Sequence, residues 1–336
     1  MILNALLAAG CLYAQEARSG DGDMPESIRS ITPKMIQDDV DHLADDAYYG
    51  RYWLSPFARE AAEWVRDQMK AAGCEPGMPE DSWFQEMKTK DASPNVIGVL
   101  RGSDPEAGWV MLGAHYDHLP PRRERRGRDT IYNGADDNAS GVAGILAVAR
   151  ALAPIRDRLE ASVMFVAFTG EEAGLKGSRH LAENPPVPLE SVKGLFNMDM
   201  ISRGEEDLIF IDGASRSPDL IKALRKANKQ VGLRLKVDKH PDWLERSDQW
   251  PFLRRNVQAV LFSVEDHEDY HEVTDHADRI MAPLAANVAR LVALATLDLA
   301  GNKPSDEKEA ANGAAEPIPS TDQKRTPEGE RKKDPE

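Results

Sequence analysis

Short apolar runs recur along the chain, each bounded by glycine or polar residues. Val163 to Phe168 has no polar interruption and stops before Thr169-Gly170. Such a run is typical of a strand covered on both faces, as in a parallel α/β sheet. Further strands are predicted over 95–100, 109–112, 192–196, 209–211, 233–237 and 258–262. The pattern therefore predicts a central sheet that is buried on both sides.

Apolar positions between these strands recur at helical spacing. In the clearest case they are Phe57, Ala61, Trp64, Val65, Met69 and Ala72. Ser55 can cap this helix, Pro56 suits its first turn and Gly73 can end it. Further helices are predicted over 33–44, 142–152, 218–228 and 284–299. Strands that alternate with helices predict an α/β domain in which a mixed, mostly parallel central sheet is flanked by helices.

Composition divides the chain into a domain and two terminal segments. Residues 1–30 combine a short apolar stretch, which resembles the core of a secretory signal or a lipoprotein leader, with an acidic, flexible segment. Residues 31–300 are expected to form one domain, and the polar, charged residues 301–336 a disordered tail. The leader predicts an extracytoplasmic protein that is secreted, periplasmic or lipid-anchored. Its apolar stretch is too short for a transmembrane span.

Charge bears on the partners of the protein, and cysteine content bears on its redox compartment. A net charge of -15 at pH 7 argues against binding to nucleic acid or to anionic membranes. The chain has two cysteines, Cys11 and Cys74, and the first lies in the leader. Cysteine usage therefore says nothing about the redox compartment.

Acidic and imidazole side chains follow the predicted strands. They are His115, Asp136 at the start of an apolar helix, the pair Glu171-Glu172, Asp199 and His271. Because the carboxyl ends of parallel strands meet at one edge of a sheet, these groups can converge. Imidazole and carboxylate are zinc ligands, so five of them form a plausible shell for two zinc ions, provided that one carboxylate bridges.

The motifs that carry these residues resemble those of family twenty-eight of the metallopeptidases. They are HYDH, NGADDNASG, FTGEEAGLKGS, NMDM and DYH, in the family's order, within residues 31–299. The resemblance implies the zinc exopeptidase fold, a phosphorylase/hydrolase-like sandwich, and a co-catalytic pair of zinc ions. It assigns the bridging role to Asp136, one zinc to His115 and Asp199, and the other zinc to Glu172 and His271. Glu171 would be the general base.

Neighbouring residues could complete the chemistry. Asp117 is expected to accept a hydrogen bond from the imidazole of His115, although it could be a surface carboxylate. Tyr270 could stabilise the oxyanion or simply be a core aromatic. Four other histidines are expected at the surface or in packing positions rather than as ligands; they are His118, His180, His240 and His276. His42 lies in the first predicted helix, without a metal context.

The sequence therefore predicts an enzyme that removes N-terminal residues from peptides. A zinc-bound hydroxide would attack the peptide carbonyl, and Glu171 would carry the proton. The alternatives are a carboxypeptidase or dipeptidase, a glutaminyl cyclase of the same fold, and a metal-containing binding module without turnover. The segment His267 to His271 also matches the H-E-x-x-H pattern of one-zinc proteases, but that pattern requires a helix and this segment lacks helical periodicity.

Overall fold

A nine-stranded sheet runs through the part of the chain that this computed structural model describes, residues 24–123 and 129–301. Its strands are β1 (Glu75–Pro76), β2 (Phe84–Gln85), β3 (Asn95–Leu100), β4 (Trp109–His115), β5 (Ser162–Phe168), β6 (Val192–Met198), β7 (Leu208–Asp212), β8 (Arg234–Val237) and β9 (Ala259–Ser263). The order is β1-β3-β5-β4-β6-β9-β7-β8, and β2 pairs with β3. The central strands β5, β4, β6 and β9 are mutually parallel, whereas β3 and β7 join them antiparallel.

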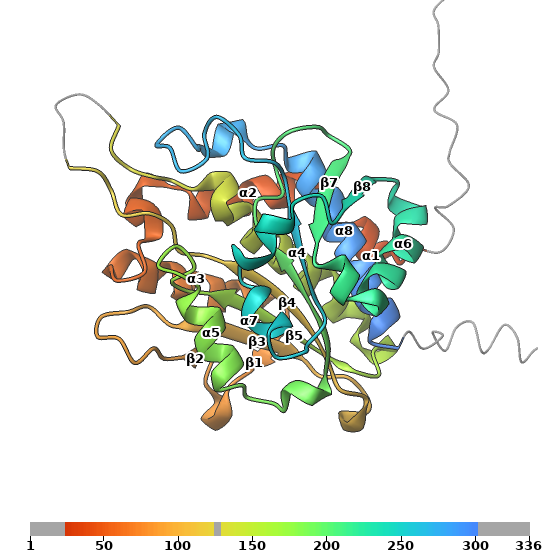
Figure 1. Ribbon diagram of the computed structural model, residues 1–336. Coiled ribbons are helices and arrows are strands. Elements are labelled where there is room, and N and C mark those ends of the chain that lie inside the picture. The colour runs from red at the N-terminus through yellow and green to blue at the C-terminus, as the bar shows by residue number, and fades with distance from the viewer. Residues whose placement is uncertain (1–23, 124–128, 302–336) are drawn as a thin grey trace, which may run out of the picture. The chain divides into compact units, whose positions relative to one another are not determined.

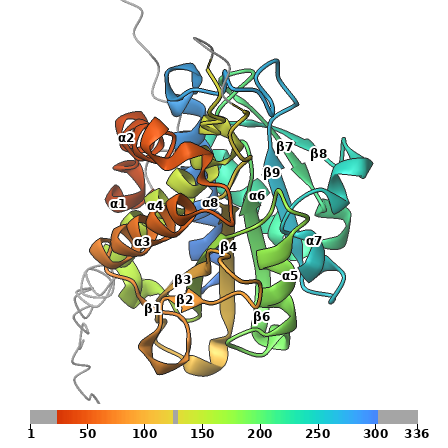
Figure 2. The ribbon, with the colours of Figure 1, turned by 90° about the vertical axis from the view of Figure 1, so that its left-hand side faces the viewer.

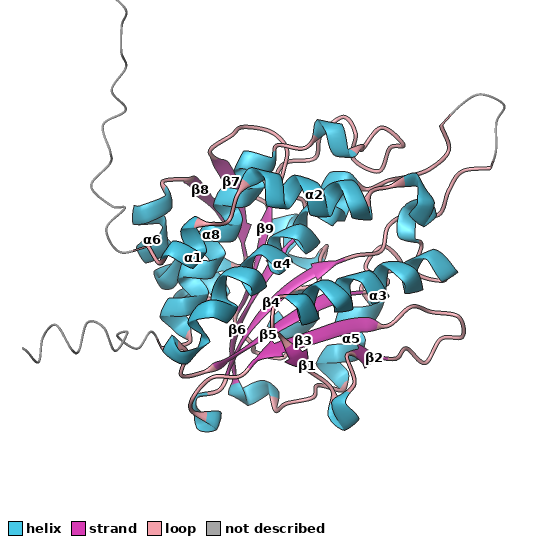
Figure 3. Ribbon diagram, turned by 180° about the vertical axis from the view of Figure 1, so that it is seen from behind, coloured by secondary structure: helices cyan, strands magenta, loops and turns pink. Residues whose placement is uncertain are grey.

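Helices cover both faces of this sheet (Figures 1 and 2). They are α1 (Glu26–Arg29), α2 (Pro33–Leu43), α3 (Pro56–Ala71), α4 (Gly141–Leu152), α5 (Lys176–Glu183), α6 (Pro218–Val231), α7 (Trp250–Leu253) and α8 (Ala282–Leu299). Helices α5 and α7 lie on one face, and the other helices lie on the opposite face, seen from behind in Figure 3. The predicted α/β fold with a mixed, mostly parallel sheet flanked by helices is confirmed.

Each face of the sheet has its own apolar core, which explains the uninterrupted apolar runs. Along β5, Val163, Phe165 and Ala167 pack into the larger core beneath α4 and α8. Met164 and Val166 point the other way, into the smaller core beneath α5 and α7. Because successive side chains of a strand alternate between the faces, a strand covered on both sides must be apolar at every position.

Local signals set the ends of α3 as predicted. The Ser55 hydroxyl accepts a hydrogen bond from the Ala58 amide at 3.2 Å, and Pro56 occupies the first turn. The helix ends at Ala71, and Gly73 follows with φ of 96°.

The N-terminal boundary of the domain differs from the prediction. Residues 24–30, expected in the flexible leader, belong to the folded domain: they contain α1, and Met24 and Ile28 are buried in the larger core. Two apolar residues are enough to dock a short helix, and no periodicity can be read from so few. The rest of the leader and residues 302–336 lie outside the described part of the chain.

Two stretches within the described residues are long and apolar enough to cross a membrane, Ala135–Arg158 and Ala282–Leu299. Most of each is buried inside the protein, α4 and α8 being helices of the larger core. Their apolar character is therefore accounted for by packing.

Candidate metal centre

The predicted site residues gather at the carboxyl edge of the parallel strands. His115 is the last residue of β4, Asp199 follows β6, and the pair Glu171-Glu172 comes just after β5. His271 lies in the loop after β9. The shared edge follows from the parallel pairing of these strands.

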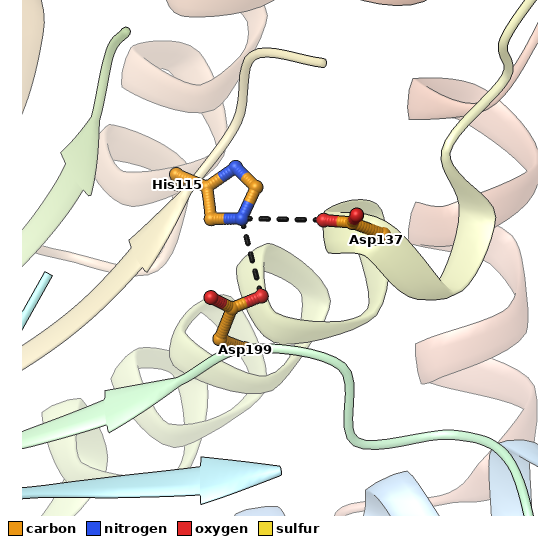
Figure 4. A group of neighbouring side chains, drawn as sticks. All are labelled: His115, Asp137 and Asp199. Atoms are coloured by element: carbon orange, nitrogen blue, oxygen red, sulfur yellow. Dashed lines mark hydrogen bonds and ion pairs between the residues drawn. The ribbon is translucent and has the colours of Figure 1, made fainter. Parts of the chain in front are cut away.

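The first group of candidate ligands consists of His115, Asp137 and Asp199 (Figure 4). The His115 Nε2 atom lies 3.3 Å from Asp137 Oδ1 and 3.1 Å from Asp199 Oδ1. His115 and Asp137 are buried, and Ser247 holds the other oxygen of Asp199 with a hydrogen bond of 2.5 Å. Three ligand atoms therefore face one point.

The second group consists of His118, Asp137 and Glu172, with His271 beside it. Glu172 Oε1 lies 2.7 Å from His118 Nδ1, and Glu172 Oε2 lies 3.3 Å from His271 Nε2. His271 Nε2 also lies 3.2 Å from Asp137 Oδ2. His118, expected at the surface or in a packing position, is fully buried, and its side chain faces these carboxylates.

Asp137 belongs to both groups through its two different oxygens. Oδ1 faces His115 and Oδ2 faces His271. This is the geometry of a bridging carboxylate. The assignment of the bridging role to Asp136 is therefore corrected to Asp137.

The carboxylate of Asp136 is occupied elsewhere. Its Oδ1 accepts hydrogen bonds from the Ser202 amide at 2.7 Å, the Ser202 hydroxyl at 2.6 Å and the Ser140 hydroxyl at 3.1 Å. Its Oδ2 lies 3.2 Å from His267 Nε2. His267 and His271 thus face different carboxylates from a non-helical loop, so they do not form the one-zinc H-E-x-x-H site.

Asp275 and Gly134 fix the turn that presents Asp137. The Asp275 carboxylate accepts hydrogen bonds from the Asp136 and Asp137 amides at 3.0 to 3.1 Å. Gly134 has φ of 57°, and a Cβ atom there would lie 2.2 Å from the Asp137 carbonyl oxygen. Only glycine, which has no Cβ atom and tolerates a positive φ, fits at this position.

Asp117 orients His115 through its main chain. The Nδ1 atom of His115 lies 3.0 Å from the Asp117 carbonyl oxygen, whereas the carboxylate is 3.9 Å away. A carbonyl can only accept, so Nδ1 carries the proton in this bond and Nε2 is left for a metal. The Asp117 carboxylate instead accepts a hydrogen bond from the Glu171 amide at 3.1 Å.

The imidazoles and carboxylates of these groups shift one another's pKa values. Burial opposes the charged form of His115, but the carboxylates of Asp199 and Glu171 outweigh it and raise the pKa of His115 well above its usual range. Burial likewise disfavours the carboxylate of Asp137, yet His118, His115 and His271 hold its pKa well below normal. Carboxylates packed this closely on imidazoles need protons or a cation.

The donor set fits zinc. Two ligands of a tetrahedral zinc ion, each about 2.1 Å from the metal, lie about 3.4 Å apart. The separations of 3.1 to 3.3 Å around His115 match that value, as do those of 3.2 and 3.3 Å around His271. Nitrogen and carboxylate oxygen are also the right donors.

Glu171 belongs to neither group but lines the same pocket. That pocket is lined by His115, Asp137, Glu171, Asp199, Met200, Trp243, Arg246, Ser247, Leu261, Ser263, Asp266, Tyr270 and His271. Burial raises the pKa of Glu171 well above its usual range, and Asp199 and Glu172 add to this effect. The Glu171 carboxyl therefore lies beside the candidate ligands without belonging to either group.

Comparison with known proteins agrees with this arrangement. Residues 95–296 match the description of peptidase family M28, over more than half of the chain. The chain belongs to peptidase family M28. The matched segment contains every member of the two ligand groups.

Relatives of this M28 chain include a probable leucine aminopeptidase 1 of Trichophyton verrucosum. The two are 29% identical over 178 residues, which cover 52% of this chain and 46% of the relative. The chain thus spans about half the length of the curated relatives that it matches. The names of these relatives agree with the assignment of this chain to a peptidase family.

Solved structures share the fold. A zinc aminopeptidase of Bacillus subtilis superposes with a TM-score of 0.67 at 15% identity, covering 83% of this chain and 96% of that one. A glutaminyl cyclase of Porphyromonas gingivalis superposes with a TM-score of 0.62 at 19% identity, covering 80% and 98%. At such identities the likeness shows the fold of an M28 chain and not its reaction.

The M28 site predicted from the sequence is thus assembled with two changes. The structure brings together His115, Glu172, Asp199 and His271, with Glu171 and Tyr270 in the adjoining pocket. It replaces Asp136 with Asp137 and adds His118. The signal for Asp137 was present as the second acid of the Asp136-Asp137 pair, and that for His118 as the final letter of HYDH.

Proposed function

We propose that this chain is a two-zinc aminopeptidase that removes N-terminal residues from peptides. The observation that carries the proposal is the Asp137 carboxylate, which faces one ligand group with each oxygen while Glu171 lines the same pocket. Paired metal sites that share a carboxylate beside a free carboxyl suit hydrolysis of an amide bond. The names of the curated relatives support the aminopeptidase direction.

The candidate ligands would be distributed between two zinc ions. His115 and Asp199 would hold one zinc, Glu172 and His271 the other, and Asp137 both. Bound zinc would supply Lewis acidity for the carbonyl and make water easier to deprotonate. His118 would either be a further ligand of the second zinc or orient Glu172 through a hydrogen bond.

Glu171 would handle the proton. Its carboxylate would accept a proton from water in the pocket and return it to the leaving amine. Burial raises the pKa of Glu171 and so favours uptake of a proton by this carboxyl.

Tyr270 would assist the carbonyl oxygen. Its hydroxyl lines the pocket and accepts a hydrogen bond from Arg246 Nη2 at 3.3 Å, and its ring stacks on His271 at 3.9 Å. We expect Tyr270→Phe to lower kcat by ~10²-fold, the scale of losing one oxyanion donor. Zinc content and KM should stay unchanged. Steady-state kinetics with metal analysis tests this, and an unchanged kcat would leave Tyr270 a packing role.

Substrate direction is tested with paired peptides. The purified protein is incubated with zinc and with leucyl peptides that carry either a free or an acetylated N-terminus, and separately with a peptide that begins with glutamine. Cleavage of the free form alone supports the proposal. Release of C-terminal residues from the acetylated form points to a carboxypeptidase, whereas loss of ammonia from N-terminal glutamine points to a cyclase. Two bound zincs without turnover on any substrate would leave a silent binding module.

A further inference from the structure

Arg51 is a fully buried arginine close to the metal centre. It lies in the turn between α2 and α3, after Gly50, and its side chain has no exposed surface. Arginine is rarely buried completely unless the charge is paired or every donor is used. The hydrogen-bond partners of the Arg51 guanidinium therefore indicate the role of this residue.

Four hydrogen bonds of the Arg51 side chain end on main-chain carbonyls. Nε donates to Tyr116 at 2.7 Å, and Nη1 donates to Leu43 and to Asn133, both at 2.6 Å. Nη2 donates to Gly134 at 3.0 Å. One planar group thus binds three separate segments of backbone.

Two of those segments carry candidate ligands. Tyr116 follows His115 directly, and Gly134 opens the turn that presents Asp137. In the first ligand group, His115 Nε2 and Asp137 Oδ1 are 3.3 Å apart, although they come from different elements. The Arg51 guanidinium is a direct bridge between the two backbones behind these side chains.

The backbone of Gly50 reinforces the same contact. A Cβ atom at Gly50 would lie 2.7 Å from the carbonyl oxygens of both Leu119 and Tyr132, and φ is 77°. These carbonyls belong to the same two loops, one after β4 and one before Asp137. The turn at residues 50–51 is therefore wedged between the ligand loops, and it approaches them independently of the Arg51 side chain.

Arg51 also supplies a fixed positive charge. Burial lowers the pKa of Arg51 to about 10, while the carboxylates of Asp117, Asp137 and Asp275 favour its charged form. The guanidinium thus remains protonated near neutral pH. It offsets part of the negative charge that the ligand loops concentrate.

We propose that Arg51 is a positioning residue that holds the His115 loop and the Asp137 loop at the separation that metal binding requires. The inference rests on the metal centre of the proposed function, and it concerns residues that contact no ligand atom themselves. The planar fork of arginine makes the bridge possible, because its donors point in fixed directions. A lysine ammonium at the same place has three donors on one atom and cannot reach all the carbonyls.

The test measures zinc affinity of the full chain by competition with a chelator. Arg51→Lys, which keeps the charge and the aliphatic stem, should raise the zinc dissociation constant by ~10-fold to 100-fold, the range seen when partners that orient ligands are lost. Arg51→Met should raise it further. The weaker zinc binding should lower kcat at limiting zinc, and saturating zinc should restore part of kcat. KM should change little.

The matched control is Arg150→Met. Arg150 pairs with Asp39 at 2.5 Å and donates to Gln68 at 2.9 Å, at the end of α4 remote from the Asp137 turn. The Arg150→Met variant should have a lower thermal midpoint of unfolding and unchanged zinc affinity, so it measures the effect of general destabilisation on zinc binding. All affinities are measured well below the midpoints of the metal-free variants. Should Arg51→Met not fold, Arg51→Lys decides.

Zinc binding by the wild-type protein distinguishes failure of the proposed function from failure of the Arg51 proposal. If the wild type binds no zinc, the proposed function fails. If the wild type binds two zincs and Arg51→Lys binds them with the same affinity, or loses no more than Arg150→Met, the positioning role of Arg51 is overturned.

Discussion

Replacing Asp137 with alanine is expected to remove both metal ions at once. Each Asp137 oxygen faces a different ligand group, Oδ1 towards His115 at 3.3 Å and Oδ2 towards His271 at 3.2 Å. Loss of a partner that merely orients a ligand costs ~10-fold to 100-fold in metal affinity, so loss of a shared ligand should cost more than ~100-fold for each ion. Elemental analysis of the desalted variant, followed by zinc titration, measures this directly.

Asp136→Asn is the comparison for this experiment. The Asp136 carboxylate accepts hydrogen bonds from Ser202 and Ser140 and faces neither ligand group. The amide keeps the shape but weakens this buried network, so a lower unfolding temperature is expected while two zincs stay bound. If Asp136→Asn lost the metals and Asp137→Ala kept them, the bridging role would return to Asp136.

The second large effect is expected for Glu171→Gln. Glu171 belongs to neither ligand group, yet its carboxyl lines the pocket with His115 and Asp199. The amide has nearly the same shape but cannot accept and release a proton. We expect two zincs per chain and a fall in kcat of ~10²-fold to 10⁴-fold, the range for loss of a general acid-base group. Pre-steady-state and steady-state hydrolysis of a leucyl peptide give kcat.

The neighbouring residue provides the control. Glu172 lies 2.7 Å from His118 and 3.3 Å from His271, so Glu172→Gln should lose zinc as well as activity. Excess zinc should restore part of the activity of this variant and none of that of Glu171→Gln. Equal metal loss in both variants would mean that Glu171 is a ligand, and full activity of Glu171→Gln would remove it from the reaction.

Elements with local signals could be predicted from the sequence. Ser55 and Pro56 begin α3 because a hydroxyl can satisfy a free amide of the first turn and proline lacks the amide that would otherwise be unpaired there. The strand Ser162–Phe168 is equally recognisable because it is buried on both faces. These signals depend on a few adjacent residues and need no knowledge of the tertiary structure.

The identity of the bridging acid could not be predicted in the same way. Asp136 and Asp137 are adjacent, and a regular helix or strand would fix which side chain faces the strand edge. The turn 135–140 is irregular instead, with Asp137 at φ of -106° and ψ of 89°. Its direction is set by Asp275, which is distant in sequence and holds the amides of both residues.

His118 and α1 show the same limit. The burial of His118 depends on Glu172, which arrives from the neighbouring strand β5. The helix at Glu26–Arg29 is too short to show periodicity, and it is held by the core against which Ile28 packs. In both cases the deciding partner is remote in the chain.

The order of the strands sets when a nascent chain could first bind metal. Strands β4, β5 and β6 pair with one another, so the region of His115, Glu172 and Asp199 can assemble from consecutive segments. His271 follows β9, which lies between β6 and β7 in the sheet although it is the last strand to be made. Until β9 adds, β6 has an open edge and the second group lacks His271. Binding of the second zinc is therefore expected only after β9 has joined the sheet, since non-local pairing of this kind comes late in folding.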